Sequence, residues 1–156
     1  MEVNQRILGA TIFVHQACAG FVLVTLTLWL QSAGMGMLIA WIRQAVEGDI
    51  HKMSPMRATA LVVRFTAAVV ILHALEILLW ASFYRWICLP SWFSAFYFSA
   101  SSYSTIGCSD VILPLDWRLF GPLESMMGVL MCGLSVSLLF AVVTRLISRN
   151  APLSRK

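Results

Sequence analysis

Three long apolar segments dominate the hydrophobic pattern of this chain. They run from Ile7 to about Leu30, from about Ala58 to Ile87 and from about Leu119 to Ile147. Each segment is longer than the roughly 20 residues that an α-helix needs to cross the hydrocarbon core of a bilayer. The pattern therefore predicts three transmembrane helices, and the expected fold class is an all-α membrane protein.

The stretches between these segments are of two kinds. Residues 31–42 stay mostly apolar, so the first helix either continues past the membrane or turns along its surface. The stretch 43–57 mixes charge with Gly48 and Pro55, which predicts a solvated connection. Residues 148–156 form a short basic tail.

Composition excludes a soluble fold. Of the 156 residues, 60% are hydrophobic and 12% are charged, whereas soluble domains have about 45–50% apolar and about 25% charged residues. A soluble domain of this size could not bury that much apolar surface, so the expected partner is the lipid bilayer. A chain this short that crosses a membrane several times leaves little room for a catalytic module, and no enzyme is expected.

Basic residues orient the chain. The eleven of them form no run, which argues against a nucleic-acid partner. Eight lie in the connection between the first two segments and the adjoining start of the second, or at the end of the third and after it: Arg43, Lys52, Arg57, Arg64, Arg145, Arg149, Arg155 and Lys156. By the positive-inside rule that side is cytoplasmic. The amino terminus is then outside and the carboxyl terminus inside.

A segment too short to span lies between the second and third apolar segments. Pro90 breaks the chain, and residues 91–114 begin with aromatic residues and end in a polar, glycine-containing stretch. Irregular backbone at membrane depth is tolerated only where protein buries it or where it lines a watery cavity. The segment therefore predicts a re-entrant helix followed by a strand that lines a pore.

This segment resembles a known family. The residues Ser104-Thr105-Ile106-Gly107-Cys108-Ser109-Asp110 resemble the potassium-channel signature T-T-V-G-Y-G-D, and Tyr97-Phe98-Ser99 resembles the aromatic part of the pore helix. Downstream, Trp117-Arg118-Leu119 followed by Gly128 and Gly133 is similar to the inner helix and its paired glycines. The resemblance covers residues 66–147. It is to the two-transmembrane pore-domain family of bacterial potassium channels, with an additional N-terminal helix.

The resemblance implies a homotetramer in the bacterial inner membrane, because one filter strand per chain cannot enclose an ion. It divides the chain into an N-terminal helix and its connection (1–57), a pore domain (58–147) and a tail (148–156). It also assigns roles by position. The filter residues are Thr105, Ile106, Gly107, Cys108, Ser109 and Asp110, with potassium or sodium held at the first three; the supports are Tyr97, Phe98, Ser101, Ser104 and Glu124; the inner-helix hinges are Gly128 and Gly133.

The filter departs from the family pattern at two positions. Cys108 replaces a tyrosine whose ring braces the filter, and Ser109 replaces the second glycine. A residue other than glycine in a left-handed conformation costs about 1–2 kcal/mol, so the Ser109 carbonyl is expected to turn from the axis. Because Thr105-Ile106-Gly107 keeps the family pattern, we expect two intact inner ion sites and a distorted or wider outer mouth.

Several of these residues also have structural interpretations. Gly128 and Gly133 fit close packing between helices as well as a hinge. Glu124 lies one turn before Gly128 and is expected at the depth of the filter. Its expected role is to brace the filter through the hydroxyl groups of Ser101, Ser102 or Ser104.

Polar residues within the apolar segments are expected to face protein or water. His73 and Glu76 are three residues apart on one helix face, and mutual satisfaction is favoured over proton transport. The tryptophans, Trp80 among them, are expected to be interfacial anchors. The four cysteines, Cys18, Cys88, Cys108 and Cys132, have no metal-ligand spacing, so no cofactor is expected beyond the permeating cation.

The expected function is therefore permeation of monovalent cations. Potassium is the first candidate, and selectivity is expected to be reduced. One alternative is a channel-like protein that does not conduct and serves as a structural or regulatory partner. Another is a membrane enzyme or proton carrier using His73 and Glu76, but no nucleophile, metal set or cofactor motif accompanies this pair.

Overall fold

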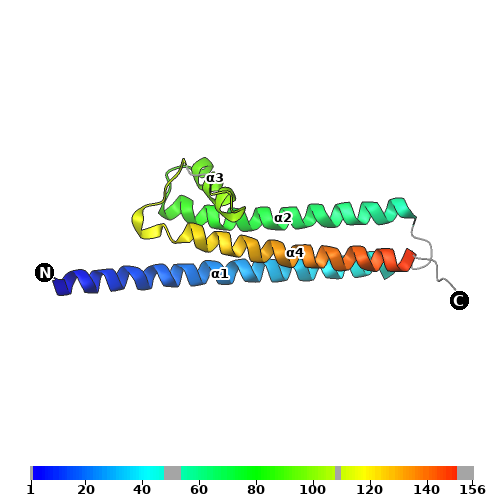
Figure 1. Ribbon diagram of the computed structural model, residues 1–156, viewed down its shortest axis with the longest axis horizontal. Helices are drawn as coiled ribbons and strands as arrows, with labels where there is room; N and C mark the ends of the chain where they lie inside the picture. Colours follow the sequence, from blue (N-terminus) through cyan, green and yellow to red (C-terminus); the bar gives the residue numbers. More distant parts are fainter. Residues whose placement is uncertain (1, 48–53, 108–109, 151–156) are drawn as a thin grey trace.

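The computed structural model describes residues 2–47, 54–107 and 110–150. This part of the chain is helical apart from short connections (Figure 1). Its elements are the α-helices α1 (Glu2–Glu47), α2 (Pro55–Ile87), α3 (Trp92–Tyr103) and α4 (Phe120–Asn150), and the 3-10 helix η1 (Leu115–Trp117).

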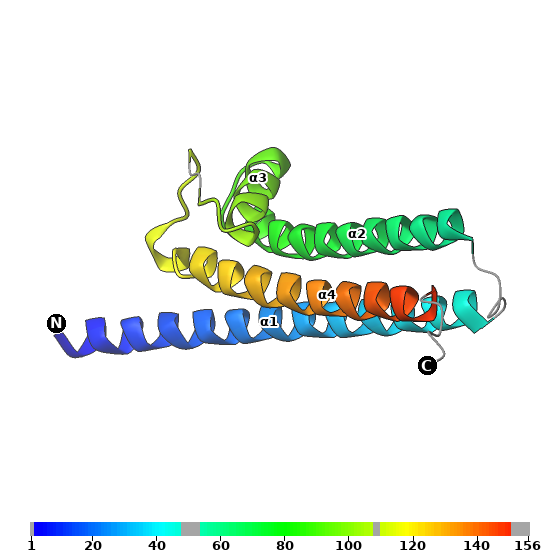
Figure 2. The same cartoon turned by 45° about the vertical axis from the view of Figure 1, so that its right-hand side comes forward.

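The helices α1, α2 and α4 lie side by side along the long axis of the molecule, and α3 is folded against one end of this bundle (Figures 1 and 2). In the described part, three stretches are long and apolar enough to cross a membrane, namely Phe13–Ala45, Met56–Ile87 and Leu115–Arg145. The predicted all-α fold class is thus confirmed, and the chain is a multi-pass membrane protein. The predicted filter strand is an irregular stretch without β-pairing in the described residues.

The helix α1 is continuous through residues 31–42. Of the two possibilities that the sequence left open, the helix continues and does not turn along the membrane surface. At 1.5 Å per residue its length is about 69 Å, against about 30 Å for a hydrocarbon core. The helix therefore extends well beyond the apolar layer.

The connection between α1 and α2 is shorter than the predicted stretch 43–57, because helix enters it from both sides. At the start of α2, the side chain of Ser54 accepts a hydrogen bond from the backbone N–H of Arg57, and Pro55 occupies the first turn. Serine at the cap and proline directly after it are the residues that favour a helix start.

The main core lies where α3 packs between α2 and α4. Trp80, Tyr84, Ala95 and Phe120 are buried in it. The expectation that Trp80 anchors the chain at the membrane interface is wrong, since Trp80 is 0% exposed. Its indole N–H donates to Thr27 Oγ1 of α1 at 3.0 Å, so this ring joins two helices inside the bundle.

Candidate functional site

The re-entrant helix α3 starts and stops at defined residues. Ser91 caps its first turn by accepting from the backbone N–H of Ser94 at 3.1 Å. After Tyr103 the chain leaves the helix, with Thr105 at φ +61° and Gly107 at φ +64°. The backbone N–H groups of Ile106 and Gly107 both donate to the Ser101 carbonyl, at 3.0 and 3.2 Å. The backbone therefore turns sharply here and is held against the last turn of α3.

The candidate filter follows directly after the C-terminal end of α3. Helix C-termini carry a partial negative charge of about half an elementary charge, which favours a cation beyond Tyr103. Thr105, Ile106, Gly107 and Asp110 are exposed in the single chain, so this chain alone does not cover them. Cys108 and Ser109 lie outside the described residues, and the expected distortion of the outer mouth stays a prediction.

Glu124 is fully buried behind α3 and joins three helices. Its carboxylate accepts from the Tyr84 hydroxyl of α2 at 2.9 Å and from the Ser99 hydroxyl of α3. Ser99 Oγ also lies 2.8 Å from the carbonyl oxygen of Ile77. The buried side chains of Tyr84, Ser99 and Glu124 thus connect α2, α3 and α4 at one point.

The partners that the structure gives Glu124 differ from the expected hydroxyl groups of Ser101, Ser102 and Ser104. Ser99 lies on the buried side of α3, whereas Ser104 is exposed beyond its end and donates to the Ala100 carbonyl at 2.7 Å. At Ser102 the contact to α4 is through the backbone, because its carbonyl accepts from the Ser125 hydroxyl at 2.7 Å. Glu124 therefore contacts α3 about one turn before the predicted position.

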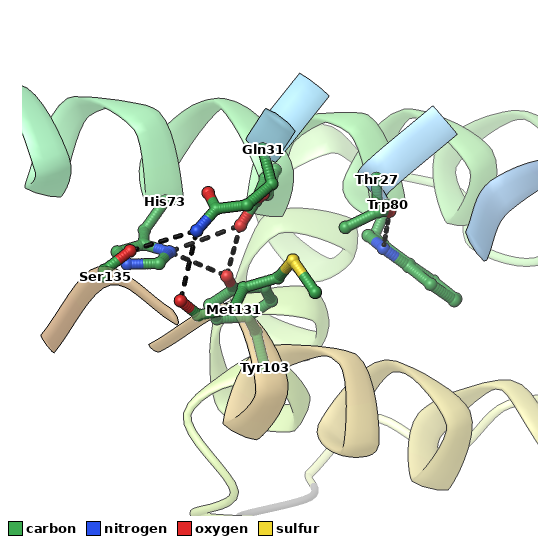
Figure 3. Close-up of polar contacts among 8 residues, drawn as sticks. Thr27, Gln31, His73, Trp80, Tyr103, Met131 and Ser135 are labelled. Atoms are coloured by element: carbon green, nitrogen blue, oxygen red, sulfur yellow. Dashed lines mark hydrogen bonds and ion pairs between the residues drawn. The ribbon is translucent and has the colours of Figure 1, made fainter. Parts of the chain in front are cut away.

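A second buried carboxylate contacts the last residue of α3. The hydroxyl of Tyr103 donates to Glu76 of α2, and His73 Nδ1 lies 3.2 Å from Glu76 Oε2 and 2.8 Å from the Tyr103 hydroxyl oxygen. Figure 3 shows His73 and Tyr103 turned toward each other. The sequence indicated the contact between His73 and Glu76 but missed Tyr103. This cluster holds Tyr103 in place, two residues before Thr105.

The residues Glu76, Trp80 and Tyr84 form a polar stripe along one face of α2. They are spaced by four residues, which places them one above another on a helix. Each bonds to a different helix: Glu76 to α3, Trp80 to α1 and Tyr84 to α4. This four-residue spacing of polar groups in an apolar segment is the signal that could have revealed the stripe.

The predicted aromatic supports, Tyr97 and Phe98, lie on different sides of α3. The ring of Phe98 packs edge-on against Tyr84, with centroids 4.9 Å apart. The ring of Tyr97 is exposed and stacks on Phe93 of the same helix, at 6.5 Å. Only Phe98 therefore reaches the core behind the candidate filter in the single chain.

The two predicted hinge glycines of α4 also differ in their surroundings. A Cβ at Gly128 would lie 2.1 Å from the carbonyl oxygen of Tyr103, so the missing side chain lets α4 approach the end of α3. A Cβ at Gly133 would meet nothing within 4 Å. The geometry therefore gives Gly128 a packing role and shows open space beside Gly133, whose hinge role stays a prediction.

The comparisons with known proteins agree with this geometry. The family described as "Ion channel" matches residues 70–145, which is slightly less than half of the 156 residues. The matched region includes most of α2, the re-entrant helix α3, the candidate filter and most of α4. Neither the curated proteins nor the solved structures gave a match. This part of the chain is thus similar to ion channels, and the whole of α1 lies before it.

Proposed function

We propose that the chain is a cation channel in which four copies surround one axis, and that potassium is its first candidate ion. The observation that carries this proposal is the stretch from Thr105 to Gly107 at the C-terminal end of a re-entrant helix, within a region similar to ion channels. Ions in such filters exchange their hydration shell for backbone carbonyls.

The backbone of this stretch supports the proposal. Thr105 and Gly107, at alternate positions, both have positive φ. Residues with positive φ between ordinary ones turn the backbone so that consecutive carbonyls can face one axis, and glycine does so without steric cost. Thr105 is β-branched, for which positive φ is unusual. The backbone N–H of Thr105 donates to the Ser102 carbonyl at 2.9 Å, and this hydrogen bond supports the conformation.

The two carboxylate clusters brace the segment from behind. Tyr103 is held by Glu76, and Ser99 is held by Glu124. Each of these hydrogen bonds contributes about 0.5–1.5 kcal/mol, and together they favour a rigid support for discriminating between ions.

Selectivity is proposed to be reduced because of Cys108 and Ser109. The test is a flux assay in liposomes on four proteins: native, Cys108→Tyr, Ser109→Gly and the double variant. The double variant should have the highest ratio of potassium to sodium flux, because the ring braces the filter and the glycine frees its backbone. Each single variant should change the ratio less.

The outcomes of this assay separate the hypotheses. A native protein that already prefers potassium as strongly as the double variant would contradict a distorted outer mouth. Absence of flux in all four proteins would contradict permeation and leave a channel-like structural partner.

The proposed orientation in the bacterial inner membrane has the amino terminus outside. The ends of α1 and α4 and the start of α2 lie at one end of the bundle, opposite to α3 (Figures 1 and 2). Arg43, Arg57 and Arg145 belong to that end, which supports a cytoplasmic assignment. Labelling of a single cysteine at position 112 from outside would agree with it, and labelling from inside would contradict it.

A further inference from the structure

Gln31 is a buried amide that crosses from α1 to α4. It is 2% exposed, and its Nε2 donates to the carbonyl oxygen of Met131 at 3.1 Å and to Ser135 Oγ at 3.0 Å (Figure 3). An amide buried without hydrogen bonds is destabilising. These contacts therefore specify how α1 lies on α4 more strictly than apolar packing would.

The two acceptors belong to one turn of α4, and this turn contains Gly133. In an α-helix the carbonyl of residue 131 pairs with the N–H of residue 135, so Gln31 contacts both ends of the same hydrogen-bonded turn. Glycine is a common place for a helix to bend, and Gly133 has open space around it. Five residues earlier, Gly128 is packed against Tyr103 and holds the first part of α4 in place.

Contacts with α2 hold α1 in place on both sides of Gln31. One turn before Gln31, Thr27 accepts from the indole of Trp80, and one turn after it a Cβ at Gly34 would lie 2.5 Å from Leu72 Cδ1. Both contacts are to α2, which also bonds to α3 and α4 near the candidate filter. The amide of Gln31 is thus held by α2 and presented to α4.

We propose that Gln31 is a positioning residue that holds the turn around Gly133 in helical geometry, and that releasing it lets α4 bend there and open the inner half of the pore. The effect on the pore rests on the proposed channel function, whereas the effect on the helix does not.

The direct test is hydrogen–deuterium exchange of the full chain in lipid nanodiscs. In Gln31→Leu, amides of residues 131–137 should exchange about tenfold faster, because two hydrogen bonds of about 0.5–1.5 kcal/mol are lost. Amides of residues 121–128 should not change. The matched control is Ser32→Ala, at the neighbouring exposed position, which should leave both segments unchanged.

A second substitution distinguishes a local effect on the turn around Gly133 from destabilisation of the whole of α4. Adding Gly133→Ala to Gln31→Leu should restore slow exchange, because alanine stabilises the helix in the turn that lost the hydrogen bonds of Gln31. No acceleration in Gln31→Leu, uniform acceleration along α4, or no restoration in the double variant would overturn the proposal. If Gln31→Leu does not fold, Ser135→Ala, which removes one of the two acceptors, should give a smaller acceleration of the same amides, and its absence would overturn the proposal equally.

Single-channel recording tests the consequence for the pore. Gln31→Leu should raise the open probability while the unitary current and the potassium-to-sodium selectivity stay unchanged, and Gly133→Ala should reverse the increase. An unchanged open probability, or a changed selectivity, would overturn the role in opening. A native protein without current would overturn the channel function instead, and the exchange experiment would still decide whether Gln31 holds the turn.

Discussion

At Gly128 the backbone of α4 lies close to the end of α3. The atom that a Cβ would meet at 2.1 Å is a backbone oxygen, which cannot move aside as a flexible side chain can. Gly128→Ala should therefore destabilise the protein by about 1–3 kcal/mol, as overpacking does. The measurement is the thermal unfolding midpoint of the protein in detergent.

The matched control for this substitution is Gly133→Ala. It is the same change in the same helix, but a Cβ there meets nothing within 4 Å. Its midpoint should be equal to that of the native protein or higher, because alanine is favoured over glycine inside a helix. Equal losses at both positions would contradict the close approach at Gly128.

The hydroxyl of Tyr84 is the second feature that can be tested at a single residue. Tyr84→Phe removes one of the two hydroxyl donors to the buried Glu124, and we expect a loss of about 1–3 kcal/mol. Thr66→Val on the same helix is the control, because the exposed Thr66 hydroxyl bonds only locally, to the carbonyl of Val62 at 3.0 Å. A loss at Thr66 as large as at Tyr84 would show that Glu124 does not depend on this donor.

At the scale of elements, α1 packs on the other helices through apolar residues such as Leu23 and through polar contacts such as the one between Thr27 and Trp80. Thr27→Val would leave the indole N–H of Trp80 buried without its acceptor, which costs about 1–3 kcal/mol. Faster hydrogen exchange along the middle of α1 and a lower unfolding midpoint are the expected results. Thr25→Val, at an exposed position where the hydroxyl bonds to the carbonyl of Phe21, should change neither. If Thr25→Val has the same effect, the indole contact is not what attaches α1.

The elements themselves could be predicted from the sequence because hydropathy and length decide which segments enter a bilayer. The three spans and the re-entrant segment could be predicted without knowing which residues pack against them. Which side chains meet depends on how each helix is rotated, and hydropathy carries no such information. Trp80 and Trp86 are both tryptophans of α2, yet Trp80 is 0% exposed and Trp86 is 77% exposed.

The candidate site was predictable to a similar degree. The motif assigned the candidate filter, and the structure places its residues Thr105 to Gly107 just after the end of α3. The motif could not place the Glu124 carboxylate against Ser99, because that depends on the depth at which α3 sits against α4. For the same reason the contact of Gln31 with α4 could not be predicted, since its partners lie about a hundred residues further along the chain.

At the scale of the whole molecule, the single chain leaves the candidate filter uncovered. Ile106 is 72% exposed, and several apolar residues of α4, among them Val129, Leu134 and Phe140, are exposed as well. Assembly of four chains would cover the filter on all sides. Native mass spectrometry of the detergent-solubilised protein should therefore give a mass four times that of one chain, and a stable monomer or dimer would contradict the proposed pore.

The polar stripe of α2 also bears on how the protein is made. Segments enter the membrane in the order of synthesis, and a charged residue near the centre of a helix costs about 2.5–3.5 kcal/mol on insertion. When Glu76 of α2 leaves the ribosome, Tyr103 is still inside the exit tunnel, but Thr27 of α1 has already emerged and can accept the hydrogen bond of Trp80. The first helix is then an insertion partner for the second.

A chain that starts at Met53 should integrate α2 less efficiently into microsomes than the full chain, as measured by glycosylation mapping, and Glu76→Leu should restore the efficiency. Equal integration with and without α1 would show that α2 enters unaided.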